Sequence, residues 1–373
     1  MKPIGILGVG QAGGNIAEIA ATYGFTTAII NTNANDTISN SKVPNKYYVP
    51  GRNGAGQNRT VGIEAVQFHW DEICKFVGQS FKNVKVLLVA FSTDGGTGSG
   101  MGPILIDVLT SYLPDTIIGA IAILPEKNVL AGNKMNASKA MAELSAIEGI
   151  GPVFIVDNEQ VRKTNPQATK SQLYQIVNTQ VIRSFDAILR ITTKSSPLGN
   201  FDEADLLNVL NTRGAAIIST TVVNDCKTQA EVSNQFNLSL IRSVFAPIET
   251  VGVVKAGLIY EGPEGLSKLI SVPALFERIG EPLLLFEGNY PNESDAVITS
   301  ILTGLPFPEK RLNLMKESLE QNRERLQSLV QKARTQKYEA KVDWVSSLTH
   351  STLKKDHIPN DVSVVAKLAK YKQ

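Results

Sequence analysis

The sequence predicts an α/β protein whose core is a mostly parallel sheet covered by helices on both faces. Short, continuously apolar segments alternate with segments of helical periodicity, and turns rich in glycine or asparagine join them. The hydrophobic fraction of 43% is large enough for an extensive packed core. At 373 residues, the chain is long enough for two domains or one large domain.

The N-terminal part contains an unbroken alternation of expected strands and helices. Continuous apolar strands are expected at residues 4–7, 26–30, 84–91, 117–124 and 151–156. Helical spacing of apolar residues predicts helices at 15–23, 60–77, 104–113 and 137–147. Strands that are apolar on both faces are typical of a buried parallel sheet, so residues 1–167 are expected to form one domain.

The rest of the chain is expected to hold a central helix, a second domain and a C-terminal extension. An apolar stripe predicts the long central helix at 168–198. Residues 199–307 are expected to form a smaller α/β domain, with strands near 215–223, 252–260 and 282–287 and helices near 229–245 and 294–302. A long charged helix with one apolar stripe is expected at 308–340, followed by a basic, flexible tail at 341–373.

Charge and composition exclude several classes of protein. The formal net charge of +2 carries no nucleic-acid signature, and we expect no direct reading of DNA sequence. Residues 309–373, however, contain 14 Lys or Arg against 8 Asp or Glu, so a mildly acidic body ends in a basic tail. The 2 cysteines and the absence of a long apolar run or a leader-like start predict a cytoplasmic protein without a membrane span or a zinc site.

Two glycine-rich loops follow buried strands and precede helices. The first contains Gly8, Gly10 and Gly13, which satisfy the GxGxxG pattern of dinucleotide-binding enzymes. That pattern also requires an acid at the end of the second strand, where this chain has Asn31 and Asn33. The second loop, DGGTGSG at residues 94–100, can wrap a phosphate with backbone N–H groups. Two such loops on one sheet favour a phosphate site over simple turns, although a non-polymerising dinucleotide-dependent enzyme stays an alternative.

The residues of these loops resemble a known family. GQAGGN at 10–15 and GGTGSG at 95–100 are similar to the first phosphate loop and the signature loop of the tubulin/FtsZ superfamily. The signature usually begins with a third glycine, which Asp94 replaces here. The resemblance implies a tubulin/FtsZ-like fold, in which an N-terminal GTP-binding domain precedes the long central helix and the smaller second domain.

The resemblance also assigns site residues across the N-terminal part. The stretch NTNA at 31–34 is similar to the family's NTDA, GAGQN at 54–58 to its third loop, and DNE at 157–159 to a guanine-reading stretch. The fifth loop, at 129–136, fits poorly because it lacks the expected acid and arginine. The residues thus expected to bind GTP or GDP are Gly10, Gln11, Ala12, Asn15, Asn33, Gly54, Ala55, Gly56, Gly95, Gly96, Thr97, Gly98, Ser99, Asn158 and Asn178, with Gln11 also near Mg²⁺.

A third stretch follows the central helix and carries the expected catalytic groups. GNFDEAD at 199–205 resembles the family's synergy loop, which reaches the γ-phosphate held by the next subunit of a head-to-tail filament. The resemblance implies that Asn200, Asp202 and Asp205 complete a GTPase site in a neighbouring subunit, where both aspartates can hold Mg²⁺ or a water. Taken alone, these residues are more typical of the N-terminal cap of a helix, and it is the glycine loops that favour catalysis.

The tail suggests one branch of the superfamily. The basic tail and the synergy loop look most like the plasmid- and phage-encoded TubZ-like proteins, which segregate DNA through an adaptor protein. An FtsZ-like division role is the alternative, because DHIP at 356–359 is faintly similar to a division-protein tail. The tail lysines that could meet an adaptor are Lys354, Lys355, Lys367, Lys370 and Lys372. The expected partners are therefore the protein itself, as a filament, and an adaptor.

Overall fold

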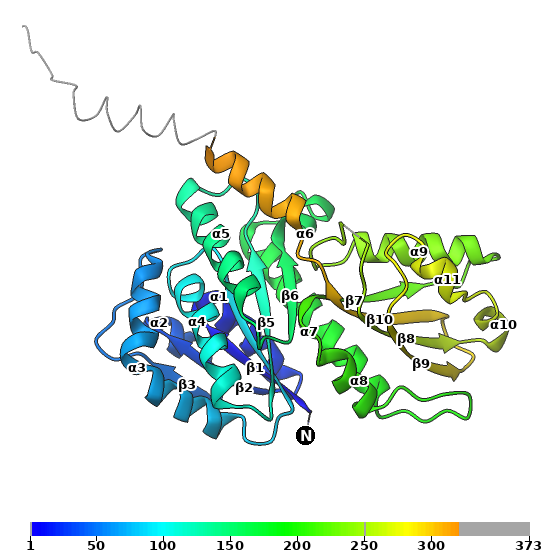
Figure 1. The fold of residues 1–373 in the computed structure, drawn as a ribbon, viewed down its shortest axis with the longest axis horizontal. Helices are drawn as coiled ribbons and strands as arrows, with labels where there is room; N and C mark the ends of the chain where they lie inside the picture. The colour runs from blue at the N-terminus through cyan, green and yellow to red at the C-terminus, as the bar shows by residue number, and fades with distance from the viewer. Residues whose placement is uncertain (1, 250, 321–373) are drawn as a thin grey trace, which may run out of the picture. The chain divides into compact units, whose positions relative to one another are not determined.

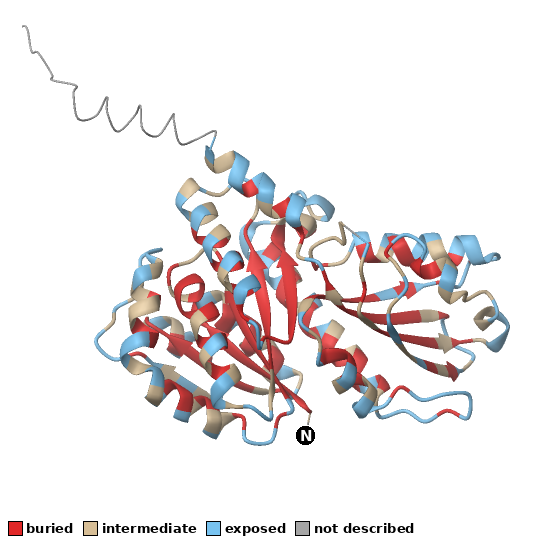
Figure 2. Ribbon diagram, in the orientation of Figure 1, coloured by how far each residue is buried: buried red, intermediate tan, exposed pale blue. Residues whose placement is uncertain are grey.

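The computed structural model describes residues 2–249 and 251–320, all of which lie in one compact unit. A single ten-stranded sheet runs through this unit in the order β3-β2-β1-β4-β5-β6-β7-β10-β8-β9 (Figure 1). The inner strands form a largely buried layer with helices packed on it, whereas the edge strands at Asn45–Tyr48 and Leu284–Pro291 are more exposed (Figure 2). This architecture confirms the predicted α/β fold.

The N-terminal half of the sheet is entirely parallel. Its strands are β1 (Ile4–Val9), β2 (Thr26–Asn31), β3 (Asn45–Tyr48), β4 (Val86–Ser92), β5 (Ile117–Leu124) and β6 (Pro152–Asp157). The helices between them are α1 (Gly10–Thr22), α2 (Ala34–Ser39), α3 (Arg59–Ser80), α4 (Thr97–Tyr112), α5 (Ala131–Ala146) and α6 (Asn158–Thr164). Every residue of β1 and β6 is buried, which explains their continuous apolar sequences. All five strands and four helices expected here are present.

The long central helix α7 (Lys170–Ile191) joins the two halves of the molecule. Its N-terminus has a capping box, in which the Thr169 side chain accepts from the N–H of Gln172 and the Gln172 side chain accepts from the N–H of Thr169. After this helix the sheet continues without interruption, because β7 (Gly214–Val222) pairs in parallel with β6. The expected boundaries at 167/168 and 198/199 therefore lie in the segment that connects β6 to β7, two paired strands of the same sheet.

The second half of the sheet contains one element that was predicted wrongly. Its remaining elements are α8 (Glu203–Leu210), α9 (Gln229–Ile241), β8 (Lys255–Gly262), α10 (Glu264–Ser267), α11 (Val272–Phe276), β9 (Leu284–Pro291) and β10 (Val297–Leu305). The expected helix at 294–302 is instead β10, which pairs antiparallel with both β7 and β8. A central strand is buried on both faces, so its run of apolar residues lacks the alternation that distinguishes a strand from a buried helix.

The C-terminal extension is described only at its start. Residues 309–320 are helical, in agreement with the first part of the helix expected at 308–340. The rest of that helix and the basic tail at 341–373 lie outside the described residues. Within residues 2–249 and 251–320, no helix has the length and apolar character needed to cross a membrane.

Candidate active site

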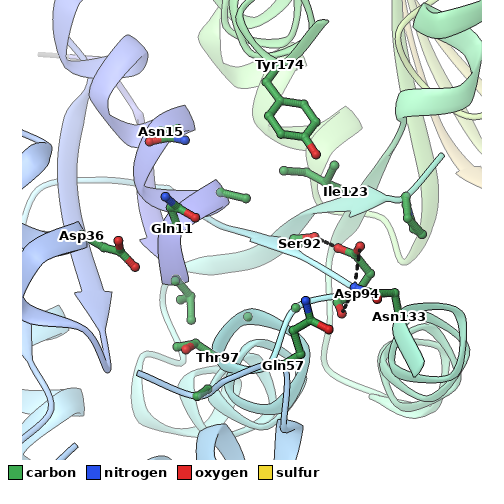
Figure 3. Close-up of a pocket in the computed structure, with 18 of the residues that line it drawn as sticks. Gln11, Asn15, Asp36, Gln57, Ser92, Asp94, Thr97, Ile123, Asn133 and Tyr174 are labelled. Carbon is green, nitrogen blue, oxygen red and sulfur yellow. Dashed lines mark hydrogen bonds between the residues drawn. The ribbon is translucent and has the colours of Figure 1, made fainter. Parts of the chain in front are cut away.

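A cavity of about 740 Å³ opens where β1, β2, β4, β5 and β6 end. The loops after these strands surround it, as expected for a ligand site at the carboxyl edge of a parallel sheet (Figure 3). Every residue that the sequence assigns to nucleotide binding lines this cavity except Ser99. Ser99 is buried, and its hydroxyl donates to the carbonyl of Gly95, so it closes the turn of the signature loop.

The first loop and the signature loop lie against each other at the floor of the cavity. Gly10 begins α1 with a φ of +70°, a conformation that side chains disfavour. A Cβ at Gly10 would lie 3.3 Å from the backbone nitrogen of Gly98. Since α1 and α4 both begin here, the free N–H groups of two helix N-termini face one cavity. Such a pair of helix starts is well suited to bind phosphate groups.

The third loop packs on the signature loop through an amide from α5. Gln57 has a φ of +63°, and its carbonyl accepts a hydrogen bond of 2.9 Å from Asn136 Nδ2. The same amide lies 3.3 Å from the carbonyl oxygens of both Asp94 and Gly95. Asn136 is buried, so one side chain holds two phosphate-facing loops together. Sequence reasoning did not assign Asn136, because its role depends on contacts between distant segments.

Two of the departures from the family pattern touch one another. Asp94 replaces a glycine of the signature loop, and Asn133 belongs to the poorly matching fifth loop. Asn133 Nδ2 lies 3.2 Å from the Asp94 carbonyl oxygen and 3.3 Å from Oδ2, while the Ser92 hydroxyl donates to Oδ1 (Figure 3). Asp94, Asn133 and Ser92 all line the cavity. The carboxylate of Asp94 is thus held by neutral donors beside the phosphate loops.

The far end of the cavity presents amides and an aromatic ring. Asn158 is buried, and its Oδ1 has no hydrogen-bond partner within the part of the chain that the structure describes. Asn178 lines the same region, and Tyr174 and Lys170 join it from the same face of α7. An unpaired amide oxygen can accept the N–H groups of guanine, and a tyrosine ring offers a surface on which a base can stack. The spacing of four residues from 170 to 174 to 178 is a signal that could have identified Lys170 and Tyr174.

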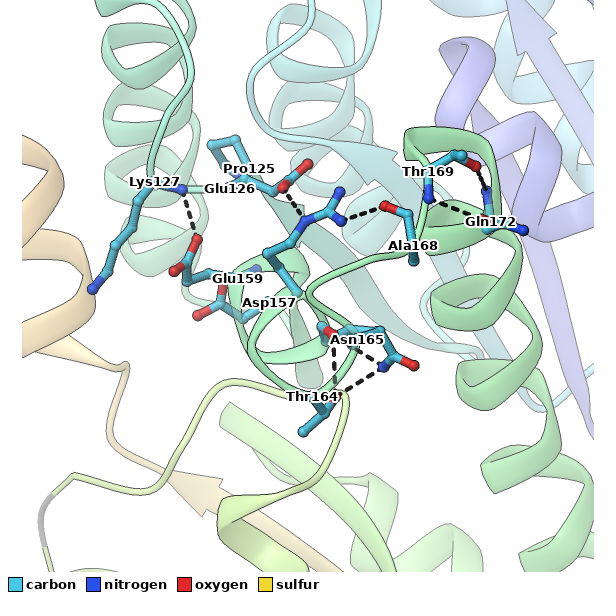
Figure 4. A network of polar contacts seen from close by, with 12 residues as sticks. Pro125, Glu126, Lys127, Asp157, Glu159, Thr164, Asn165, Ala168, Thr169 and Gln172 are labelled. Atoms are coloured by element: carbon cyan, nitrogen blue, oxygen red, sulfur yellow. Dashed lines mark hydrogen bonds and ion pairs between the residues drawn. The ribbon is translucent and has the colours of Figure 1, made fainter.

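A polar network fixes the loops around this end (Figure 4). Arg162 Nε donates to Glu126 Oε2 at 2.7 Å, and Arg162 Nη1 donates to the Ala168 carbonyl at 2.5 Å. The hydrogen bond that Arg162 donates to the Glu126 carboxylate raises the pKa of Arg162 further, because it stabilises the charged guanidinium. The N–H of Lys127 donates to Glu159 Oε2 at 3.0 Å. The network joins the loop after β5, helix α6 and the start of α7, and it therefore holds in place the segments that line this end of the cavity.

Comparison with known proteins agrees with this arrangement. Residues 3–166 match the family model for the tubulin/FtsZ family, GTPase domain. This chain carries a tubulin/FtsZ GTPase domain. With both glycine loops on one cavity, the tubulin/FtsZ interpretation replaces the dinucleotide-dependent alternative.

The relatives come from more than one branch of the tubulin/FtsZ family. The tubulin-like protein CetZ of Pyrococcus abyssi is 25% identical, with 80% of this chain and 85% of the relative covered. The tubulin-like protein TubZ of Clostridium botulinum C phage is 20% identical, with 84% and 81% covered. A GTPγS-form protofilament of Bacillus thuringiensis serovar israelensis TubZ has the same fold, with a TM-score of 0.76, 18% identity and 90% and 95% covered. Because CetZ and TubZ proteins both match, the similarity does not single out the TubZ branch that the tail suggests.

The cavity has oxygen donors of the kind that Mg²⁺ prefers. The Gln11 amide and the Asp36 and Asp94 carboxylates all line it (Figure 3). Asp36 and Asp94 lie on opposite sides of the cavity (Figure 3), and no group of three or more acidic, histidine or cysteine side chains converges within the described residues. Mg²⁺ is commonly held by one or two carboxylates together with the phosphates of a nucleotide, so the lining suits an ion that the nucleotide itself helps to hold. Asp36 was not predicted, because it follows β2 outside the aligned motif.

The predicted catalytic residues do not line the cavity. Asp202 caps α8, and its Oδ1 accepts from the N–H of Asp205 at 3.0 Å, while Asp205 Oδ2 accepts from the N–H of Asp202 at 3.1 Å. Asn200 Oδ1 accepts from the N–H of Ser196 at 2.6 Å. The capping role expected from the residues alone is therefore present. It uses one oxygen of each aspartate, so a second oxygen of each is available for another function.

Proposed function

We propose that this protein is a GTP-dependent, filament-forming GTPase whose active site is shared between adjacent subunits. The observation that carries the proposal is that the two parts of the expected active site, which we call half-sites, lie apart within one chain. One half-site is the nucleotide cavity, and the other is the pair of carboxylates Asp202 and Asp205. The nucleotide cavity lies at the carboxyl edge of the parallel strands, whereas Asp202 and Asp205 lie on the first turn of α8 and outside that cavity. A second copy stacked head to tail would bring the two half-sites together. The Bacillus thuringiensis TubZ structure, which is a protofilament, supports this mode of assembly.

The division of labour follows from the chemistry of each half-site. The N–H groups at the starts of α1 and α4 bind the phosphates, Thr97 places a hydroxyl beside them, and Asn158 and Asn178 read the guanine. A bound Mg²⁺, near Gln11, would neutralise part of the phosphate charge. Asp202 or Asp205 of the neighbouring copy orients a water and accepts one of its protons. The water oxygen then bonds to the γ-phosphorus as the bond to the β–γ bridging oxygen breaks, releasing phosphate and leaving GDP.

Removal of either carboxylate tests the shared site. We expect Asp202→Ala and Asp205→Ala to keep GTP binding and GTP-dependent assembly, measured by light scattering, but to lose phosphate release. Each variant also loses part of the cap, at a cost of about 1 kcal/mol in stability. Glu203→Ala is the matched control, because Glu203 lies in the same turn but outside the capping box. Normal hydrolysis by both aspartate variants would contradict the proposal.

The cargo of the filament is proposed from the basic tail. We propose that residues 341–373 contact an adaptor bound to plasmid or phage DNA, so that cytoplasmic filaments move or position that DNA. A small DNA-binding protein encoded beside this gene should co-sediment with filaments of the full chain and not with filaments lacking 341–373. Equal sedimentation with both filaments would contradict the role of the tail, and recruitment of the filaments to the division site would favour the FtsZ-like alternative.

A further inference from the structure

The synergy loop is fastened to β9, the edge strand of the sheet. The N–H of Asn289 donates to the carbonyl of Gly199 at 3.1 Å. The Tyr290 hydroxyl accepts from the N–H of Phe201 at 2.8 Å and lies 3.4 Å from the carbonyl oxygen of the same residue. Both polar groups of the Phe201 backbone are thus held by one side chain. An edge strand has free N–H groups on its outer side, and here the loop uses one of them.

The Phe201 side chain packs against two glycines. Phe201 is fully buried, and Tyr290 is only 5% exposed. A Cβ at Gly257 of β8 would lie 2.8 Å from Phe201 Cε2, and a Cβ at Gly288 of β9 would lie 3.0 Å from Phe201 Cβ. A side chain at either glycine would displace Phe201, because these distances are shorter than the contacts that real Cβ atoms make. The backbone at 201 is therefore clamped by a hydroxyl and by close packing on two strands.

The clamp acts on the residues that carry the carboxylates. Asp202 directly follows Phe201 and forms the reciprocal capping box with Asp205. On the other side of the clamp, the N–H of Ser196 donates to Asn200 and the N–H of Leu198 donates to the Ser196 hydroxyl at 3.2 Å. The segment from 196 to 205 therefore contains consecutive local bonds, and Tyr290 and Asn289 provide its fixed points on the sheet.

We propose that Tyr290 is a positioning residue for GTP hydrolysis in the neighbouring subunit. This inference rests on the proposed shared active site. Tyr290 holds the Phe201 backbone and thereby sets where Asp202 and Asp205 are presented at the subunit contact. Reacting groups held on rigid elements keep productive geometry, and a displacement of about 1 Å can lower a rate by about a hundredfold. The start of α8 is thus linked to β9 by the Tyr290 hydroxyl and by the backbone bond from Asn289 to Gly199.

Removal of the hydroxyl alone tests the inference. We expect Tyr290→Phe to lower phosphate release per assembled subunit by about tenfold, with the GTP affinity of the monomer and the critical concentration unchanged within twofold. Tyr260→Phe is the matched control, because Tyr260 is also buried on a strand of the same sheet, and its hydroxyl donates to the Pro263 carbonyl at 2.7 Å instead. The control should keep the turnover of the unmodified protein. This split between turnover and assembly would not follow from a general loss of stability.

The outcomes distinguish this inference from the function on which it rests. Normal turnover by Tyr290→Phe, together with inactive Asp205→Ala, would overturn the positioning role alone. Normal turnover by both Asp202→Ala and Asp205→Ala would overturn the shared active site itself. Should Tyr290→Phe fail to fold, Gly288→Ala is the second variant: its Cβ would lie 2.8 Å from Tyr290 Cε2 and 3.0 Å from Phe201 Cβ, so it displaces the same pair of residues and is expected to give the same loss of turnover. A folded Gly288→Ala protein with full turnover would then overturn the positioning role.

Discussion

Asp94 places a negative charge beside a phosphate site. It lines the cavity together with three other charged residues, Asp36, Glu126 and Lys170. Glu126 is paired with Arg162, whereas the described partners of the Asp94 carboxylate, Ser92 and Asn133, are neutral. Like charges in a partly buried site repel by about 1–2 kcal/mol at separations near 8 Å. The glycine usual at this position in the family would bring no such charge.

Neutralising Asp94 should therefore strengthen nucleotide binding when no divalent cation is present. We expect Asp94→Asn to lower the Kd for GDP in EDTA by about tenfold, because the repulsion between carboxylate and phosphates is removed. In excess Mg²⁺ the two proteins should differ by less, since the cation already offsets that charge. Displacement of a fluorescent GDP analogue under both conditions measures the difference.

A second variant separates charge from shape at this position. Asp94→Gly restores the family's glycine and also removes the contacts with Ser92 and Asn133. If charge dominates, the glycine and asparagine variants will tighten GDP binding in EDTA to a similar extent. An unchanged Kd in EDTA for Asp94→Asn would show that the carboxylate does not act on the phosphates.

Among the secondary-structure elements, the helix that begins at residue 309 contacts the end of the cavity that Pro125 and Asn158 line. Arg311 Nε donates to Asp157 Oδ2 at 2.9 Å and Arg311 Nη2 donates to Oδ1 at 3.2 Å, and both side chains are almost completely buried. Arg311 Nη2 also donates to the Pro125 carbonyl at 2.6 Å. Asp157 precedes Asn158, and Pro125 itself lines the cavity. One arginine thus bridges the C-terminal helix and two cavity-lining segments.

Breaking this bridge should affect stability and nucleotide binding together. Arg311→Met leaves the buried Asp157 carboxylate without its charged partner, which typically costs about 3–5 kcal/mol in the free energy of unfolding. We expect a lower Tm in the absence of nucleotide and a several-fold weaker affinity for GTP. Differential scanning calorimetry and equilibrium binding measure the two effects.

The neighbouring residue provides the control for this variant. Lys310 is exposed and precedes Arg311 in the same helical turn, so Lys310→Met removes a charge without breaking the buried pair. It should leave both the Tm and the GTP affinity close to those of the unmodified protein. A lower Tm for Arg311→Met with unchanged GTP affinity would mean that the pair stabilises the fold without supporting the base site.

At the scale of the whole molecule, a shared active site predicts complementation between copies. Asp205→Ala keeps its cavity, so it should retain bound GTP labelled in the γ-phosphate. We expect labelled phosphate to be released when unmodified protein is added with excess unlabelled GTP, because a neighbour supplies the missing carboxylate. Rapid-quench sampling measures the release before labelled GTP exchanges.

The control replaces the added unmodified protein with unlabelled Asp205→Ala protein. Unlabelled Asp205→Ala protein, added in place of the unmodified protein, cannot supply the carboxylate and should produce no release. Equal release with both additions, or none with either, would argue against hydrolysis across a subunit contact.

The order of residues along the chain is enough to predict the chemistry of the local segments. Glycine loops between apolar strands and helices bind phosphate through the backbone, and this property needs only the order of residues along the chain. The α/β class, the two loops and the family resemblance were therefore predictable. The cavity-lining positions of Lys170 and Tyr174 could also have been predicted, because their spacing places them on one helix face with Asn178.

The contacts between distant segments, in contrast, are known from the fold and not from the order of residues. Three contacts illustrate this: Asn136 with two loops, Asp94 with Asn133, and Tyr290 with Phe201. The residue types in these contacts do not indicate which partner each side chain has. The strand β10 belongs to the same class, since its identity depends on the pairing with β7 and β8 and not on its own periodicity. The periodicity of a segment indicates which of its faces is buried. It does not indicate which other segment packs on that face, because this depends on the fold of the whole chain.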